Sequence, residues 1–187
     1  MMKINALLIT LFSALALAAP IDLSKTSHEI NFLAVGQPSA LKISGKLAPG
    51  SAMTGKLEVV KNELVGNASI ALDSFDTGIG LRNRHMKEKY LETAKYPEAK
   101  ISLKPLKLNP ADLQNPSFSY EGPFSATLDL HGVSKEISGV AKLRRDKQVW
   151  SGDYEFAFEL SDYGIEIPSY LGIKVSKTVK VNVAFKQ

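Results

Sequence analysis

The chain of 187 residues contains no cysteine. This absence excludes a disulfide framework, and it also excludes a lipoprotein anchor attached through a cysteine. Only three histidines are present, His28, His85 and His131, and their spacing forms no His-x-His or His-x₃-His pair. Without such a pair and without a cysteine, the sequence predicts no metal site.

Recognisable catalytic motifs are also missing. No Gly-x-Ser-x-Gly nucleophile elbow occurs. The stretch from Gly50 to Lys56 has the spacing of a phosphate-binding loop, but Leu57 stands where a magnesium-binding Ser or Thr is needed, and a strand pattern follows it. We interpret this stretch as a hairpin turn. The sequence therefore predicts no catalytic residues, no cofactor and no enzymatic activity.

The only long apolar run lies at the N-terminus. It extends from Ile4 to Ala16 behind Lys3, and Ala16-Leu17-Ala18 has the small-x-small pattern of a cleavage site. The run is shorter than the roughly 20 apolar residues that cross a bilayer. We predict a signal peptide over residues 1–18, with cleavage after Ala18 or Ala19. Residues 20–187 then form one domain, periplasmic or secreted, with no stable membrane span.

The charges are nearly balanced. The chain has 23 basic and 19 acidic residues, a formal net charge of +4, and removal of Lys3 with the signal peptide lowers it to +3. Basic clusters such as Arg144-Arg145 are interrupted by acids and lie near turns. This composition argues against nucleic acid as a partner. It leaves a homodimer open.

Most of the chain alternates apolar and polar residues with period two, which is typical of strands with one buried face. Three of the apolar stripes are Ile30-Phe32-Ala34, Tyr154-Phe156-Phe158-Leu160 and Val179-Val181-Val183-Phe185. The opposite faces are polar, as in an antiparallel sheet with one solvated side. The pattern predicts an all-β barrel or sandwich of about eight strands. The last strand suits pairing with the first, which would close a barrel and remove both edges.

The alternation stops between Asp73 and Leu103. A turn at Asp76-Thr77-Gly78 leads into a charged, helix-compatible run over about residues 82–95, and Tyr96-Pro97 ends it. Asn83 is a residue type that favours helix N-caps, and we expect it to begin the helix. The segment predicts a short helical insertion that covers part of the barrel.

The apolar faces mix large residues such as Phe124 and Phe156 with small ones such as Ala126 and Gly139. The interior of a barrel of about eight strands is filled by side chains or holds one small ligand. Periodicity alone leaves both possibilities open and favours the filled core.

Three motifs resemble the YceI-like family. The first runs from Asp76-Thr77-Gly78 through Leu81-Arg82-Asn83-x-His85-Met86 and Tyr90-Leu91 to Lys95-Tyr96-Pro97. The second is Leu128-Asp-Leu-His131-Gly132-Val133-Ser134-Lys135, which is similar to Leu-x-x-His-Gly-Val-Thr-Lys. The third joins Ser161-Asp162-Tyr163-Gly164-Ile165 to Pro168-Ser169-Tyr170-Leu171-Gly172-Ile173. Together they span essentially the whole mature chain.

The resemblance implies an extended, antiparallel lipocalin-like barrel that binds a long isoprenoid chain, such as a quinone or polyprenyl lipid, in an apolar tunnel. It favours the tunnel over the filled core and makes the helical insertion a lid. By strand parity, the expected tunnel-lining residues are Phe32, Ile70, Leu72, Leu128, Phe156, Phe158 and Val181. Arg82, His85 and Tyr90 on the insertion are expected at the mouth, where they would orient a polar headgroup.

Two alternatives accompany this prediction. An enzyme acting on a lipid in the same cavity would need His85 or His131 to point inward beside a serine. A partner-binding protein would have a filled core. The chain also departs from the family at Asn83, where the family commonly has Asp. A helix cap survives this exchange, whereas an ion pair between Arg82 and a carboxylate at that position does not.

Overall fold

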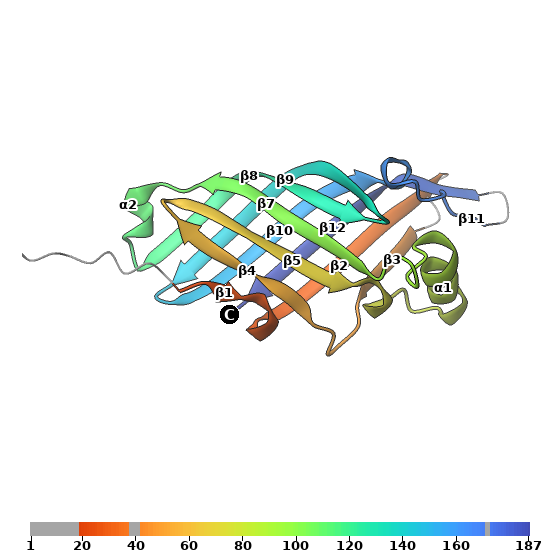
Figure 1. Ribbon diagram of the computed structural model, residues 1–187, viewed down its shortest axis with the longest axis horizontal. Helices are drawn as coiled ribbons and strands as arrows, with labels where there is room; N and C mark the ends of the chain where they lie inside the picture. Colours follow the sequence, from red (N-terminus) through yellow and green to blue (C-terminus); the bar gives the residue numbers. More distant parts are fainter. Residues whose placement is uncertain (1–18, 38–41, 171–172) are drawn as a thin grey trace, which may run out of the picture.

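The structure, a computed structural model, describes residues 19–37, 42–170 and 173–187. The predicted signal peptide, residues 1–18, lies outside the described residues. The described chain forms one antiparallel sheet that curls into an extended half-barrel, with α1 near one end and α2 near the other (Figure 1). The prediction of an all-β, lipocalin-like fold with a short helical insertion is confirmed.

The sheet has twelve strands in the described residues, in the order β1-β4-β5-β7-β8-β9-β10-β12-β2-β3-β6, with β11 paired to β12. Their bounds are β1 Ile21–Asp22, β2 Ser27–Gln37, β3 Lys42–Leu47, β4 Met53–Val60, β5 Glu63–Ala71, β6 Phe75–Asp76, β7 Glu98–Lys107, β8 Ser117–Leu130, β9 Val133–Asp146, β10 Val149–Glu159, β11 Ser169–Tyr170 and β12 Ile173–Lys186. The helical elements are η1 Leu23–Lys25, η2 Leu72–Ser74, α1 Gly80–His85, the π-helix η3 Met86–Tyr90, α2 Pro110–Leu113 and η4 Leu160–Tyr163.

The strand count differs from the predicted number of about eight. The additional strands are short: β1, β6 and β11 have two residues each. Two residues carry no period-two pattern, so the sequence does not indicate them.

The pairing of the last strand with the first long strand is confirmed, because β12 pairs with β2 and Val183 lies opposite Ile30. This pairing does not remove both edges, however. Among the described residues the sheet ends at β1 and β6, and β3 shares no ladder with β4. The ladder between β2 and β3 begins at Asn31. Before Asn31, the His28 side chain connects β2 to β4 by accepting a hydrogen bond from Met53 N at 3.1 Å.

The interior has two parts. The half nearer α2 is filled by a buried cluster that includes Leu64, Phe118, Leu143 and Trp150, with the Phe118 and Trp150 rings 5.6 Å apart. The half nearer α1 contains a second cluster built on β8, β9 and β12. The filled half closes one end of the interior, so any cavity in the other half is blind at its inner end.

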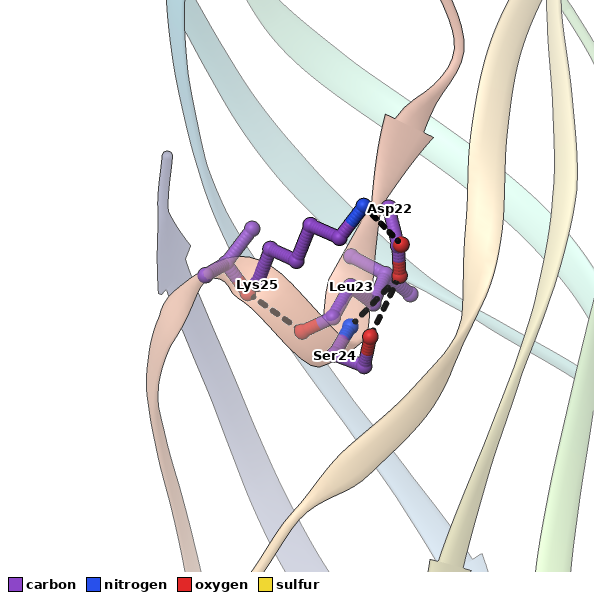
Figure 2. A network of polar contacts seen from close by, with 5 residues as sticks. Asp22, Leu23, Ser24 and Lys25 are labelled. Atoms are coloured by element: carbon purple, nitrogen blue, oxygen red, sulfur yellow. Dashed lines mark hydrogen bonds and ion pairs between the residues drawn. The ribbon is translucent and has the colours of Figure 1, made fainter.

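The chain enters the filled half through the tight turn η1 (Figure 2). Asp22 caps this turn, since its Oδ1 accepts hydrogen bonds from Ser24 N at 3.1 Å and Ser24 Oγ at 2.6 Å, and Lys25 Nζ lies 3.2 Å from Asp22 Oδ2. The turn directs Leu23, which is 2% exposed, into the core. These exposed polar contacts therefore orient a residue that helps to close the inner end.

Candidate functional site

An apolar cavity of about 560 Å³ lies in the half of the sheet nearer α1. Its volume falls within the roughly 300–1,000 Å³ of typical ligand sites. The walls come from β2, β5, β7, β8, β10 and β12, and the segment containing α1 and η3 borders it. We call residues 79–95 the lid. The cavity shows that this half is not a filled core.

One row of paired residues explains why the space stays open. Val181 lies opposite Phe32 on one side and Phe156 on the other. The row ends in glycines, because Gly45 pairs with Phe32 and Gly139 pairs with Phe156. A Cβ on Gly45 would lie 2.3 Å from Phe32 Cζ, and one on Gly139 would lie 2.9 Å from Phe156 Cβ. The Phe32 ring therefore lies close over Gly45, and the Phe124 ring, with Cε1 2.9 Å from the same Cβ position on Gly139, lies close over Gly139. The absence of side chains on these glycines leaves volume at the centre.

All ten residues predicted for the tunnel and its mouth border this one cavity. Seven of them face it from the sheet or from η2, and three face it from the lid: Phe32, Ile70, Leu72, Leu128, Phe156, Phe158 and Val181, and Arg82, His85 and Tyr90. Period-two parity placed the strand residues because alternate side chains of a strand lie on one face. Their part in lipid binding stays a prediction.

Other lining residues were missed. Ile79 and Leu81 border the cavity from the start of the lid, and Ile165 borders it from the loop after η4. Ile79 and Ile165 lie outside helices and strands, and Leu81 lies in the first turn of the six-residue helix α1, which is too short to show a clear periodicity. Met86 had a usable signal, since Arg82, Met86 and Tyr90 follow one another at intervals of four residues, which is helical spacing.

The helix of the lid does not begin at Asn83. α1 starts at Gly80, and Ile79 is its N-cap without a side-chain cap. The Asn83 side chain instead holds the preceding turn: its Oδ1 accepts from Thr77 N at 2.8 Å and from Thr77 Oγ1 at 2.6 Å. The prediction was wrong because the amide found its partners in the Asp76-Thr77-Gly78 turn rather than in the first helical turn.

Asn83 also connects the lid to β6. Its Nδ2 donates to Asp76 Oδ1 at 2.7 Å, and Gly78 N donates to the same oxygen at 2.8 Å. These two hydrogen bonds, that from Asn83 first, hold the pKa of the Asp76 carboxyl below its usual value. A charged Asp76 is thus part of the tie between lid and sheet.

The end of the lid is held by a second tie. Thr93 Oγ1, which is buried, donates to Asp73 Oδ1 at 2.7 Å. The His131 ring lies in the β8–β9 turn, with Nε2 2.8 Å from Glu92 Oε2 and Nδ1 3.0 Å from the Tyr163 carbonyl oxygen. The Tyr96 ring packs on it at a centroid distance of 4.4 Å. His131 therefore joins the lid, the hairpin and η4.

Arg82 provides the main polar group at the cavity wall. Its Nη2 donates to the Thr77 carbonyl oxygen. Its Nε is buried and has no hydrogen-bond partner among the described residues. A buried donor without a partner carries a desolvation cost, which an acceptor group of a ligand would relieve.

The two histidines considered for catalysis, His85 and His131, differ in their position relative to the cavity. His131 does not border the cavity. His85 borders the cavity, as do Ser69 and Ser169, but no hydrogen bond joins His85 to either serine among the described residues. In the same part of the chain, no three His, Asp or Glu side chains gather as a metal site. Burial, then the charges of Asp162 and Asp129, raises the pKa of Tyr163 to about 12, so that this hydroxyl stays neutral.

The family model of the YceI-like domain matches residues 22–187. The chain therefore belongs to the YceI-like family, as its motifs indicated. A search of the curated proteins found no match. None of the helices in the described residues is long and apolar enough to cross a membrane.

Solved structures share the fold. A polyisoprenoid-binding domain from Saccharophagus degradans is similar over 91% of this chain and 97% of its own, at 22% identity and a TM-score of 0.69. BcnA of Burkholderia cenocepacia is similar over 86% of this chain and 96% of its own, at 12% identity and a TM-score of 0.67. The YceI protein of Campylobacter jejuni covers 78% of this chain and 84% of its own, at 15% identity and a TM-score of 0.57.

Proposed function

We propose that this protein binds a long-chain isoprenoid lipid, of quinone or polyprenyl type, in the cavity beneath the lid, without catalysing a reaction on it. The observation that carries the proposal is an apolar cavity whose polar groups at the lid are Arg82, His85 and Tyr90. Such a cavity suits a molecule with an apolar tail and one polar end. Membership of the YceI-like family and the fold shared with a polyisoprenoid-binding domain support it.

The energetics suit an apolar tail. Each methylene group moved from water into the cavity contributes about 0.8 kcal/mol, so each five-carbon isoprene unit contributes roughly 4 kcal/mol before the cost of ordering the chain. Phe32, Phe156 and Val181 provide the apolar contacts. Binding thus needs no specific polar contact along the tail.

The polar end of the ligand belongs at the lid. The partnerless Nε of Arg82 is a donor that a headgroup oxygen would satisfy. His85 and Tyr90 border the cavity beside it. A phosphate or a quinone carbonyl provides the acceptor.

We place the protein in the periplasm or outside the cell, because the N-terminal run has the pattern of a signal peptide. In that compartment a bound isoprenoid would be shielded from water without a membrane around it. The ligand is carried or stored rather than converted.

Native mass spectrometry of the purified protein tests the proposal. A bound adduct is expected, and extraction with organic solvent should release it as an isoprenoid. A protein that is repeatedly empty, and that stays empty after incubation with quinone and with polyprenyl phosphate, would contradict the proposal.

A further inference from the structure

The start of the lid exposes two apolar side chains at the edge of the cavity. Ile79 is 53% exposed and Leu81 is 52% exposed, the highest values among the large hydrophobic residues that the structure describes as exposed. Both also border the cavity. The apolar surface of the cavity therefore continues outward onto these two residues.

The backbone that carries these side chains is held in place. Asn83 N donates to the Ile79 carbonyl oxygen at 2.9 Å, and the Asn83 side chain ties the adjacent turn through Thr77 and Asp76. Gly78 and Gly80, on either side of Ile79, have open space around them. Ile79, the N-cap of α1, and Leu81, in the first turn of α1, thus project from a backbone that is held in place.

The lid also carries an excess of basic residues. It contains Arg82, Arg84, Lys87, Lys89 and Lys95 against Glu88 and Glu92, a formal excess of three positive charges. Residues 19–187 as a whole have 22 basic and 19 acidic residues, which is the same excess of three. Glu166 offsets Lys89 at 3.4 Å, whereas Arg84 is exposed. The rest of the mature chain is neutral overall.

We propose that the lid docks on the surface of an anionic phospholipid bilayer, with Ile79 and Leu81 inserted among the lipids and the basic side chains at the headgroups. Apolar side chains flanked by Lys and Arg are the composition of interfacial membrane segments. The inference rests on the proposed function, since docking places the cavity mouth against the membrane from which an isoprenoid chain comes. The chain would then move along continuous apolar surface.

Flotation with vesicles tests this docking. The wild-type protein should bind vesicles of phosphatidylglycerol and phosphatidylcholine, and bind phosphatidylcholine vesicles weakly. Replacing both exposed residues, Ile79→Ser with Leu81→Ser, should weaken binding about tenfold or more, because the inserted apolar area is lost. The matched control is Val140→Ser with Val149→Ser, two valines that are each 45% exposed away from the cavity; it should bind like wild type.

The charge contribution has its own pair of variants. Arg84→Ser should weaken binding about fivefold, the loss expected for one cation near an anionic surface, and added salt should reduce this difference. Arg144→Ser is the control. It removes an exposed arginine near the end of β9 that is farther from the β8–β9 turn, and vesicle binding should not change.

The outcomes separate the docking from the ligand. Wild-type protein that retains isoprenoid but binds no anionic vesicles overturns the docking alone. The docking is also overturned if the variant with both Ile79 and Leu81 replaced binds vesicles as wild type does. It is overturned as well if the wild-type protein is a dimer without vesicle binding and this variant is a monomer. Vesicle binding through the lid by a protein that never holds isoprenoid supports the docking surface and overturns the proposed ligand.

Discussion

Nε2 of His131 lies 2.8 Å from Oε2 of Glu92, and this contact fastens the end of the lid to the turn between β8 and β9. The other ring nitrogen lies 3.0 Å from the Tyr163 carbonyl oxygen. Carboxylate and carbonyl oxygens only accept, so both contacts are hydrogen bonds when both ring nitrogens carry protons. A residue of the second family motif thus acts as a clamp between three elements.

Loss of this clamp should destabilise the protein. His131→Ala is expected to lower the free energy of unfolding by about 1–3 kcal/mol, because it removes both hydrogen bonds and the packing on Tyr96. Glu92→Gln should cost less than about 1 kcal/mol, since the Glu92 side chain is 46% exposed. Urea unfolding measures both. His131→Asn tolerates the positive φ of 52° at this position and controls for backbone strain; stability of both His131 variants equal to wild type would contradict the clamp.

A charge inside the cavity should abolish ligand retention. Phe156→Asp places a carboxylate among apolar residues, and the extracted isoprenoid should fall below detection. Ala157→Asp is the matched control, because Ala157 is the next residue of β10 and is exposed on the opposite face. Circular dichroism confirms that each variant is folded. Equal ligand content in the two folded variants would refute the assigned cavity wall.

A smaller change tests the cavity without a charge. In Gly45→Ala the new Cβ would lie 2.3 Å from Phe32 Cζ, so the ring must turn toward the cavity and reduce its volume. Ligand content per protein should fall while the fold persists. Gly80→Ala adds the same methyl group where nothing lies within 4 Å, and it should leave the ligand content unchanged. Equal ligand content in the Gly45→Ala and Gly80→Ala variants would argue against a ligand inside the cavity.

Arg82→Gln should separate the headgroup from the tail. It removes the charge and the Nε donor at the cavity wall while keeping a polar side chain. We expect affinity for a polyprenyl phosphate to fall about tenfold or more, since a hydrogen bond to a charged group is lost. Affinity for the corresponding apolar hydrocarbon should change little, as measured by displacement of a fluorescent lipid. An equal loss for both ligands would show that Arg82 acts only on the shape of the lid.

The tie between Asp76 and Asn83 should respond to pH. The pKa of Asp76 is lowered in the folded protein, so its stabilising contribution is present above the ordinary aspartate range and is lost as pH falls through the lowered pKa. The protection factors of the lid amides, which correct the exchange rate for the pH dependence of intrinsic exchange, should therefore fall in acid.

Asn83→Asp should change the sign of this dependence. Two carboxyl groups would then meet where Nδ2 now lies 2.7 Å from Asp76 Oδ1, and the pKa of one of them would rise. The tie would be present in acid and lost as pH rises through that pKa. If the lid amides of the variant are equally protected from hydrogen exchange across this pH range, the role of Asn83 is contradicted.

The sequence predicted side-chain direction well and volume poorly. Phe156 and Val181 were placed correctly because a strand alternates faces with a fixed period. Parity does not say whether the space between inward side chains is filled. That depends on register, which puts Gly45 and Gly139 beside the phenylalanines and lies outside any single-strand pattern.

The lid shows the same limit. Its existence followed from the loss of alternation, but its bounds did not. The helical part ends at Tyr90 rather than at Tyr96-Pro97. Its start was missed because Asn83, a typical cap residue, makes its contacts with Thr77 and Asp76 instead. Ile79 and Leu81 gave no signal, since the N-cap and first turn of a six-residue helix have no periodicity to mark an exposed apolar pair.

The position of the bound ligand tests the central claim most directly. A crystal structure of the protein purified with its extractable lipid should show an elongated apolar chain between Phe32, Phe156 and Val181, with its polar end within hydrogen-bonding distance of Arg82. A structure at the same ligand content that shows the lipid on the outer surface, with the cavity beneath the lid empty or filled with water, would contradict it.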